Sequence, residues 1–157
     1  MGTTNVNGCK SCTKGQYNDV EGSMLGCKNC PKGKYSASEK NAKDSDCQNC
    51  ISGKYSITLA AESINSCVDC IVSKYSESVG ASAENTCKLC VLGFEQKKAG
   101  MSYCLPCTPG KKGVADSGGY SICKTCGANY YSHTTKLVSL NFIFFFFYSF
   151  FFFKNNF

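Results

Sequence analysis

The sequence predicts a small disulfide-rich repeat protein: an elongated rod of short β-hairpins and irregular loops, followed by a C-terminal hydrophobic helix. The first reason is that seven Cys-x-x-Cys doublets contain all 14 cysteines of the 157-residue chain. The second is their even spacing, with 17 to 20 residues between the second cysteines of successive doublets, which indicates tandem copies of one short unit. The third is a largely apolar run at residues 137–153, with Ser139, Asn141, Tyr148 and Ser149 as its polar interruptions. The doublets are Cys9/Cys12, Cys27/Cys30, Cys47/Cys50, Cys67/Cys70, Cys87/Cys90, Cys104/Cys107 and Cys123/Cys126.

These features divide the chain into an N-terminal tail (1–8), seven cysteine-rich repeats (9–133), a transmembrane segment (137–153) and a C-terminal tail (154–157). Between the doublets the chain is mostly polar, with too few apolar residues for an ordinary core. Disulfides are expected to replace that core, because closing a loop of about 15 residues stabilises by about 3 kcal/mol in the chain-entropy model. All 14 cysteines are therefore candidate structural residues.

A second pattern follows each doublet. Counted from the second cysteine, Gly falls at the third position and Tyr at the fifth, usually with Ser after it, as in Cys30-Pro-Lys-Gly33-Lys-Tyr35-Ser36. Gly suits a turn with positive φ, and the Tyr ring can lie against the neighbouring disulfide. Ser73 and Asn129 replace Gly in two copies, and Phe94 and Lys112 mark two degenerate copies. We therefore expect short hairpins and almost no helix before residue 134, with the turn formers Gly15, Gly33 and Gly53 and the packing rings Tyr17, Tyr35, Tyr55, Tyr75 and Tyr131.

The repeated Cys-x-x-Cys-x-x-Gly-x-Tyr-Ser unit resembles the growth-factor-receptor-type cysteine-rich repeats, and within them most closely the ephrin-receptor-like repeat. The resemblance covers about residues 9 to 132. The chain is also similar to the cysteine-periodic surface antigens of ciliates. This resemblance implies an extracellular or luminal, disulfide-bonded module of the EGF-like kind.

The cysteine pairing is open between two schemes. In one, each doublet's second cysteine joins the first cysteine of the next doublet, which leaves Cys9 and Cys126 without partners in the chain. In the other, doublets cross-link in twos, which leaves one doublet over. Both schemes suggest that neighbouring repeats are missing or that the ends pair with another chain. Residues 1–8 also lack a secretory signal, so we expect the chain to be a fragment or an incomplete gene model.

Zinc is the rival interpretation, because Cys-x-x-Cys pairs about 15–20 residues apart are also typical of four-thiolate sites. An intracellular multi-zinc scaffold is therefore the alternative function. The uniform spacing and the odd number of doublets favour disulfides, and we predict neither a metal nor another cofactor.

No catalytic constellation is evident. The one histidine, His133, lies in a polar stretch without a partner for a dyad, and Cys-x-x-Cys lacks the βαβ context of a redox enzyme. We predict no enzymatic activity. The net charge of +6 comes from 17 lysines without arginine, scattered along the repeats, so a nucleic-acid partner is not expected either.

The C-terminal run contains nine Phe between Lys136 and Lys154. As a helix it would measure about 25 Å, just enough to cross a bilayer. Two alternatives remain: a lipid-anchor signal beginning near Gly127 and Ala128, or translated noncoding sequence from an AT-rich genome.

The sequence thus predicts a non-enzymatic, membrane-anchored cell-surface protein whose repeats form a structural or recognition ectodomain. Its partners would be the membrane, through residues 137–153, and an unknown extracellular protein or glycan. Recognition would use the variable loops Ser36–Asp46 and Ser56–Ser66.

Overall fold

The computed structural model describes residues 8–132. His133 and the apolar run at 137–153 lie outside the described residues, as do the predicted terminal tails except Gly8. Within residues 8–132 no helix is both long and apolar enough to cross a bilayer. The chain separates into two compact units, of which unit 1 comprises Met1–Leu89 and Gln96–Cys104, and unit 2 comprises Cys90–Glu95 and Leu105–Phe157.

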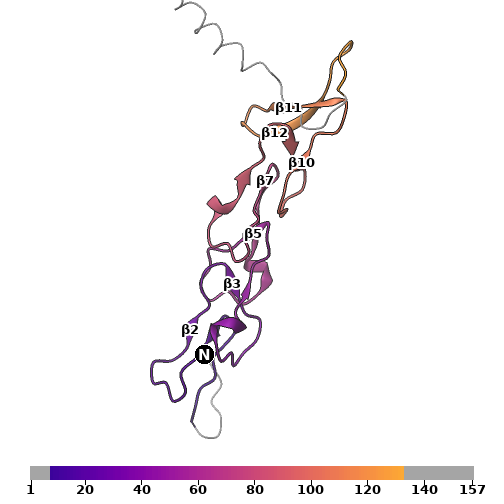
Figure 1. Cartoon of the computed structure of the whole chain (residues 1–157). Coiled ribbons are helices and arrows are strands. Elements are labelled where there is room, and N and C mark those ends of the chain that lie inside the picture. Colours follow the sequence, from indigo (N-terminus) through magenta and orange to yellow (C-terminus); the bar gives the residue numbers. More distant parts are fainter. Residues whose placement is uncertain (1–7, 133–157) are drawn as a thin grey trace, which may run out of the picture. The chain divides into compact units, whose positions relative to one another are not determined.

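Unit 1 contains four antiparallel hairpins, each made of two consecutive strands of only two residues. They follow one another in chain order (Figure 1). A single 3₁₀ turn precedes the second strand of the last three hairpins. The elements are β1 (Gln16–Tyr17), β2 (Lys28–Asn29), β3 (Lys34–Tyr35), η1 (Asp44–Asp46), β4 (Gln48–Asn49), β5 (Lys54–Tyr55), η2 (Ile64–Ser66), β6 (Val68–Asp69), β7 (Lys74–Tyr75), η3 (Glu84–Thr86) and β8 (Lys88–Leu89).

Unit 2 contains two hairpins. Strands β9 (Phe94–Glu95) and β10 (Leu105–Pro106) form a short one like those of unit 1. Strands β11 (Lys111–Ala115) and β12 (Ser121–Thr125) form a longer one, with five residues in each strand. The predicted short hairpins are therefore confirmed, and the helical structure among residues 8–132 is limited to the three 3₁₀ turns.

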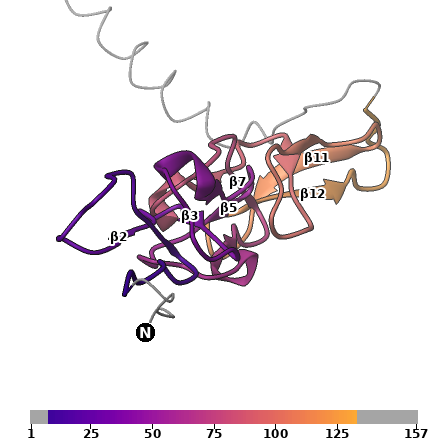
Figure 2. The same ribbon diagram turned by 90° about the horizontal axis from the view of Figure 1, so that it is seen from below.

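Backbone hydrogen bonds between copies hold the hairpins of unit 1 together. The Gly33 N–H donates to the Ser56 carbonyl (2.9 Å), and the Ser56 N–H donates to the Ala81 carbonyl (2.9 Å). In the opposite direction, the Gly80 N–H donates to the Cys50 carbonyl (2.7 Å). Figure 2 shows β3, β5 and β7 close together in projection, as expected for successive copies stacked in one direction. Each copy therefore supplies donors and acceptors at the same places for the next.

Most buried residues of the described chain are small. Eleven hydrophobic residues are buried, and nine of them are cysteines; the other two are Ala61 and Ala81. Three serines at equivalent positions, Ser36, Ser56 and Ser76, are at most 2% exposed. Sulfur and small side chains thus fill the space that large apolar side chains fill in an ordinary domain.

Candidate functional site: the disulfide ladder and its surface

The disulfides join neighbouring doublets in sequence. In five bridges the second cysteine of one doublet bonds the first cysteine of the next, with Cα atoms 5.5–5.8 Å apart. These bridges are Cys12–Cys27, Cys30–Cys47, Cys50–Cys67, Cys70–Cys87 and Cys107–Cys123. Cys90 and Cys104 are also disulfide-bonded, which makes six bridges. The sequential scheme is confirmed, and the twelve bridged cysteines include neither Cys9 nor Cys126.

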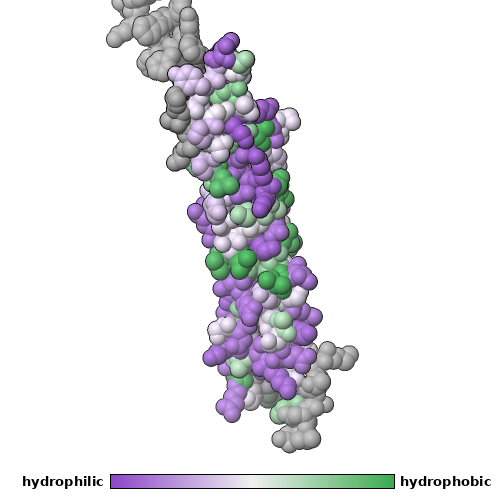
Figure 3. Space-filling view, turned by 90° about the vertical axis from the view of Figure 1, so that its right-hand side faces the viewer, coloured by the Kyte–Doolittle hydropathy of each residue, from purple (hydrophilic) through white to green (hydrophobic). Residues whose placement is uncertain are grey.

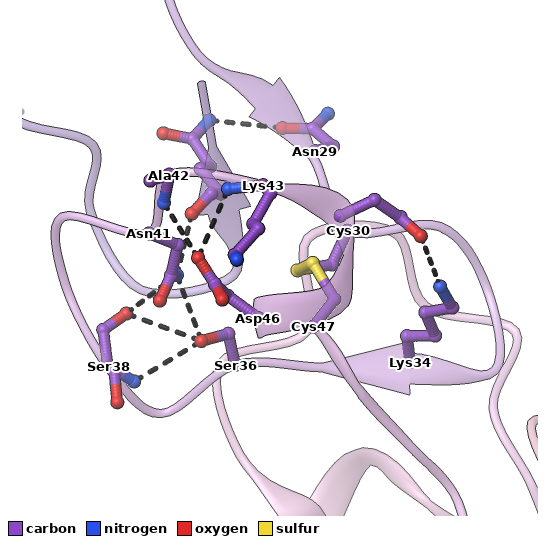
Figure 4. The surroundings of a disulfide bond; sticks show 12 residues. Asn29, Cys30, Lys34, Ser36, Ser38, Asn41, Ala42, Lys43, Asp46 and Cys47 are labelled. Carbon is purple, nitrogen blue, oxygen red and sulfur yellow. Dashed lines mark hydrogen bonds and ion pairs between the residues drawn. A yellow bond between two sulfur atoms is a disulfide. The ribbon is translucent and has the colours of Figure 1, made fainter. Parts of the chain in front are cut away.

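The surroundings of Cys30–Cys47 show how one rung is held (Figure 4). Both cysteines are buried, at 0% and 3% exposure. Beside them the Asp46 carboxylate accepts the backbone N–H groups of Ala42 (2.8 Å) and Lys43 (3.1 Å), which closes the turn leading into Cys47. The loop between the two cysteines is therefore held by its own hydrogen bonds as well as by the bridge.

Asn41 is the most connected polar side chain in this loop, and it is only 8% exposed. Its amide N–H₂ donates to the Gln16 carbonyl (2.8 Å), the Ser36 hydroxyl (2.9 Å) and the Ser38 carbonyl (3.1 Å). Figure 4 shows the amide pointing between the two serines. Because Gln16 belongs to the preceding copy, Asn41 joins two repeats through a side chain.

The turn formers have the backbone that the sequence predicts. Gly15, Gly33 and Gly53 have φ of +71°, +82° and +82°. Ser73 and Asn129, which replace Gly in the pattern, keep positive φ at +63° and +68°. The rings of Tyr17, Tyr35, Tyr55 and Tyr75 are half-buried, and their packing against disulfides stays a prediction. Tyr131 differs, because it is 79% exposed.

Sequence reasoning missed two recurring positions that hold the copies together. The first is the serine after the tyrosine in three copies, Ser36, Ser56 and Ser76. It is buried, and its N–H and carbonyl both bond to other copies, as Ser36 does with Gly15 and Ala61. The second position forms a parallel β-bridge with the tyrosine of the preceding copy. Asn41, Ala61 and Ala81 occupy it in successive copies. The 20-residue step between Ala61 and Ala81 was the available signal.

Ion pairs at the edges of the hairpins balance charge within several copies. The lysine that precedes the tyrosine pairs with a carboxylate in three copies: Lys34 with Asp44 (2.5 Å), Lys54 with Asp69 (2.5 Å) and Lys74 with Glu84 (3.7 Å). In the first copy Lys28 donates to Asp19 (2.6 Å), and this hydrogen bond lowers the pKa of the Asp19 carboxyl.

The two variable loops differ in the side chains that they expose. In Ser56–Ser66 the side chains of Ile57, Leu59 and Ile64 are 50–62% exposed, whereas Ser36–Asp46 has no large apolar residue. On the face drawn in Figure 3, apolar residues form small separate spots among hydrophilic ones. The two loops thus offer surfaces of different chemistry on the same scaffold.

The described residues contain no group of three or more His, Cys, Asp or Glu side chains placed to hold a metal ion. The twelve bridged cysteines have their sulfurs in disulfides, so these sulfurs cannot act as thiolate ligands.

No protein-family model matches the chain, and no curated protein sequence matches it significantly. Its class therefore rests on its own structure. The chain is a disulfide-rich repeat protein of the kind that folds in an oxidising, extracellular or luminal environment.

Proposed function

We propose that residues 9–133 are the ectodomain of a non-enzymatic cell-surface protein, anchored in the membrane by residues 137–153. In this proposal the repeats are structural or recognition modules of the ephrin-receptor-like type. The observation that carries it is the sequential disulfide ladder, in which each bridge closes the loop of one copy. Such a ladder grows by adding copies and presents one variable loop in each.

The distribution of side chains supports this role. Buried positions repeat from copy to copy as Cys, Ser and Ala, whereas the exposed loop residues vary. A scaffold that is constant inside and variable outside suits display of binding surfaces, because a changed loop leaves the bridges intact. The apolar composition of residues 137–153 supports an anchor, since a small sulfur-rich core has no room for nine Phe.

The first test is intact mass spectrometry of the full chain, produced through an oxidising compartment and treated with an alkylating reagent before and after reduction. We expect a mass deficit of about two hydrogens for each of six bridges, with zinc absent from the same sample. If the doublet cysteines alkylate without reduction and the sample contains bound zinc, the proposal is wrong and the multi-zinc scaffold is the better description.

The anchor is tested separately in cells by deleting residues 137–153. The full chain should stay in carbonate-washed membranes, with its repeats open to externally added protease, and the deleted chain should leave the membrane fraction. A full chain extracted by carbonate would contradict the anchor and leave the ladder untouched.

A further inference from the structure

The hairpin β11–β12 differs from the others in length and in charge. Its strands place Lys112 directly opposite Lys124. Residues paired in this way across antiparallel strands have Cβ atoms about 4.5–5.5 Å apart and project from the same face. Two like charges in such a pair repel each other, and the arrangement is unfavourable unless an anion lies near them.

The other copies avoid this repulsion at the same register position. Four of them have a tyrosine where Lys112 stands, and two of these tyrosines face a lysine: Tyr17 faces Lys28, and Tyr75 faces Lys88. In the first pair the Lys28 ammonium lies 5.9 Å from the centre of the Tyr17 ring, where the attraction is favourable. Replacement of the ring by Lys112 turns an attractive pair into a repulsive one.

Carboxylates do not neutralise this hairpin. Among residues 8–132, no ion pair involves Lys111, Lys112 or Lys124. Lys111 occupies the position of Lys34, Lys54 and Lys74, each of which has an acidic partner. The two carboxylates of unit 2 in the described range accept backbone N–H groups instead: Glu95 accepts that of Cys123 (3.1 Å), and Asp116 accepts those of Gly118 and Tyr120 (2.9 Å each).

Two exposed aromatic residues belong to the segment whose backbone bonds to the start of this hairpin. The Gly110 N–H donates to the Ser132 carbonyl (3.2 Å), so the segment after β12 returns to the start of β11. This segment carries Tyr130 and Tyr131, which are 78% and 79% exposed. A tyrosine ring has an apolar body and a hydroxyl tip, which suits contact with the face of a sugar ring.

We propose that Lys112 and Lys124, together with Tyr130 and Tyr131, form a binding surface for an acidic glycan that carries sulfate or carboxylate groups. We call these four residues the basic hairpin patch. An anion between the two ammonium groups removes their repulsion, and the tyrosines contact the sugar rings. This inference rests on the extracellular placement of the repeats. That placement also favours a glycan over lipid headgroups, because anionic lipids are concentrated in the cytoplasmic leaflet.

The test measures binding of the full chain, in detergent micelles, to an immobilised heparin decasaccharide across a range of salt concentrations. The variant Lys112→Tyr/Lys124→Gln removes two charges and restores the residue type that the four hairpins of unit 1 have at the position of residue 112. We expect it to weaken binding by about tenfold near 0.15 M salt and to flatten the salt dependence, because two ionic contacts are lost. Tyr130→Ser/Tyr131→Ser should weaken binding while the salt dependence stays the same.

The matched control is Lys54→Gln/Lys74→Gln, which removes the same two charges from lysines that already have acidic partners. It should bind heparin like the unchanged chain, and thiol alkylation should show intact bridges in every variant. If the control weakens heparin binding equally, the loss is explained by net charge alone, and the proposed patch is wrong. Absence of heparin binding, or stronger binding to phosphatidylserine vesicles, would also overturn it, whereas the ladder and anchor are judged by their own experiments.

Discussion

The Cα of Gly33 faces the carbonyl group of Gly80 so closely that a Cβ at residue 33 would clash with it. Gly15 has the same relation to Ala60, and Gly53 to Gly100. Each of these glycines therefore does two things: it takes up a positive φ, and it lets the backbone two copies further along pack against the turn.

Gly33→Ala should destabilise unit 1 by about 2–4 kcal/mol, because a left-handed backbone disfavours Ala by about 1–2 kcal/mol and the clash with Gly80 adds to this. Denaturant unfolding followed by tyrosine fluorescence measures the change. Gly110→Ala is the matched control, since Gly110 has φ of +81° and nothing within 4 Å of its would-be Cβ. Equal losses for the two variants would show that the close approach has no energetic role.

Ser73→Gly should stabilise the protein by about 1 kcal/mol, because Ser73 has φ of +63° at a position where the pattern otherwise places Gly. The same unfolding measurement tests it. Ser52→Gly, at a residue without positive φ, should instead have a small destabilising effect. Loss of stability in Ser73→Gly would mean that the serine side chain contributes more than its backbone strain costs.

Asn41→Ala should cost about 1–3 kcal/mol, because it leaves the Gln16 carbonyl and the Ser36 hydroxyl without the amide that now bonds them in a buried place. Hydrogen exchange should speed up at the Asn18 N–H, which donates to the Asn41 carbonyl at 3.0 Å. The control Asn29→Ala removes an exposed hydrogen bond that the Gln16 side chain donates, and it should change stability by less than about 0.5 kcal/mol. Similar costs for the two variants would contradict the role of Asn41 as a link between copies.

Cys50→Ser/Cys67→Ser removes one rung without leaving a lone thiol, and should cost about 2–5 kcal/mol. Because copies contact their neighbours, the loss should be local. Hydrogen exchange at the Cys70 N–H, bonded to the Gly53 carbonyl at 2.8 Å, should rise sharply, whereas that at the Cys126 N–H should change little. A uniform rise at both amides would indicate one cooperative body instead.

The ion pair between Asp19 and Lys28 predicts the direction in which stability changes with pH. The hydrogen bond from Lys28 lowers the pKa of Asp19 below 3.8, so its stabilising contribution is present above that value and is lost as pH falls through the lowered pKa. Both side chains are exposed, so the effect on stability is small. In Lys28→Gln the carboxyl pKa of Asp19, measured by NMR titration, should return toward 3.8. An unchanged pKa would show that the pair does not form in solution.

The sequence predicted the local part of this architecture well. Spacing of the doublets identified the copies, and the Gly-x-Tyr pattern located the turns, including the positive φ of Asn129. These features depend on a few neighbouring residues, so each copy reveals them independently. Of the two pairing schemes that spacing alone allowed, the structure selects the sequential one, as in Cys30–Cys47.

The contacts between copies were less accessible from the sequence. Gly80 and Ala81 lie far along the chain from the residues they contact, Gly33 and Ser56, and no local pattern joins these positions. Asn41 belongs to the predicted variable loop Ser36–Asp46, yet its amide is buried and donates three hydrogen bonds. The facing pair Lys112 and Lys124 also emerged only from strand register, because a one-residue shift would place the two side chains on opposite faces.

By itself the sequence determined the repeat, the disulfide-rich class and the residues that make each turn. These follow from covalent chemistry and from backbone preferences of single residues, which act within one copy. Only the tertiary structure decided which copies touch, which small residues become buried and which charges lack partners. Those outcomes depend on hydrogen bonds and close packing between segments about 20 to 50 residues apart, as between Gly33 and Gly80, and such contacts exist only once the copies are stacked.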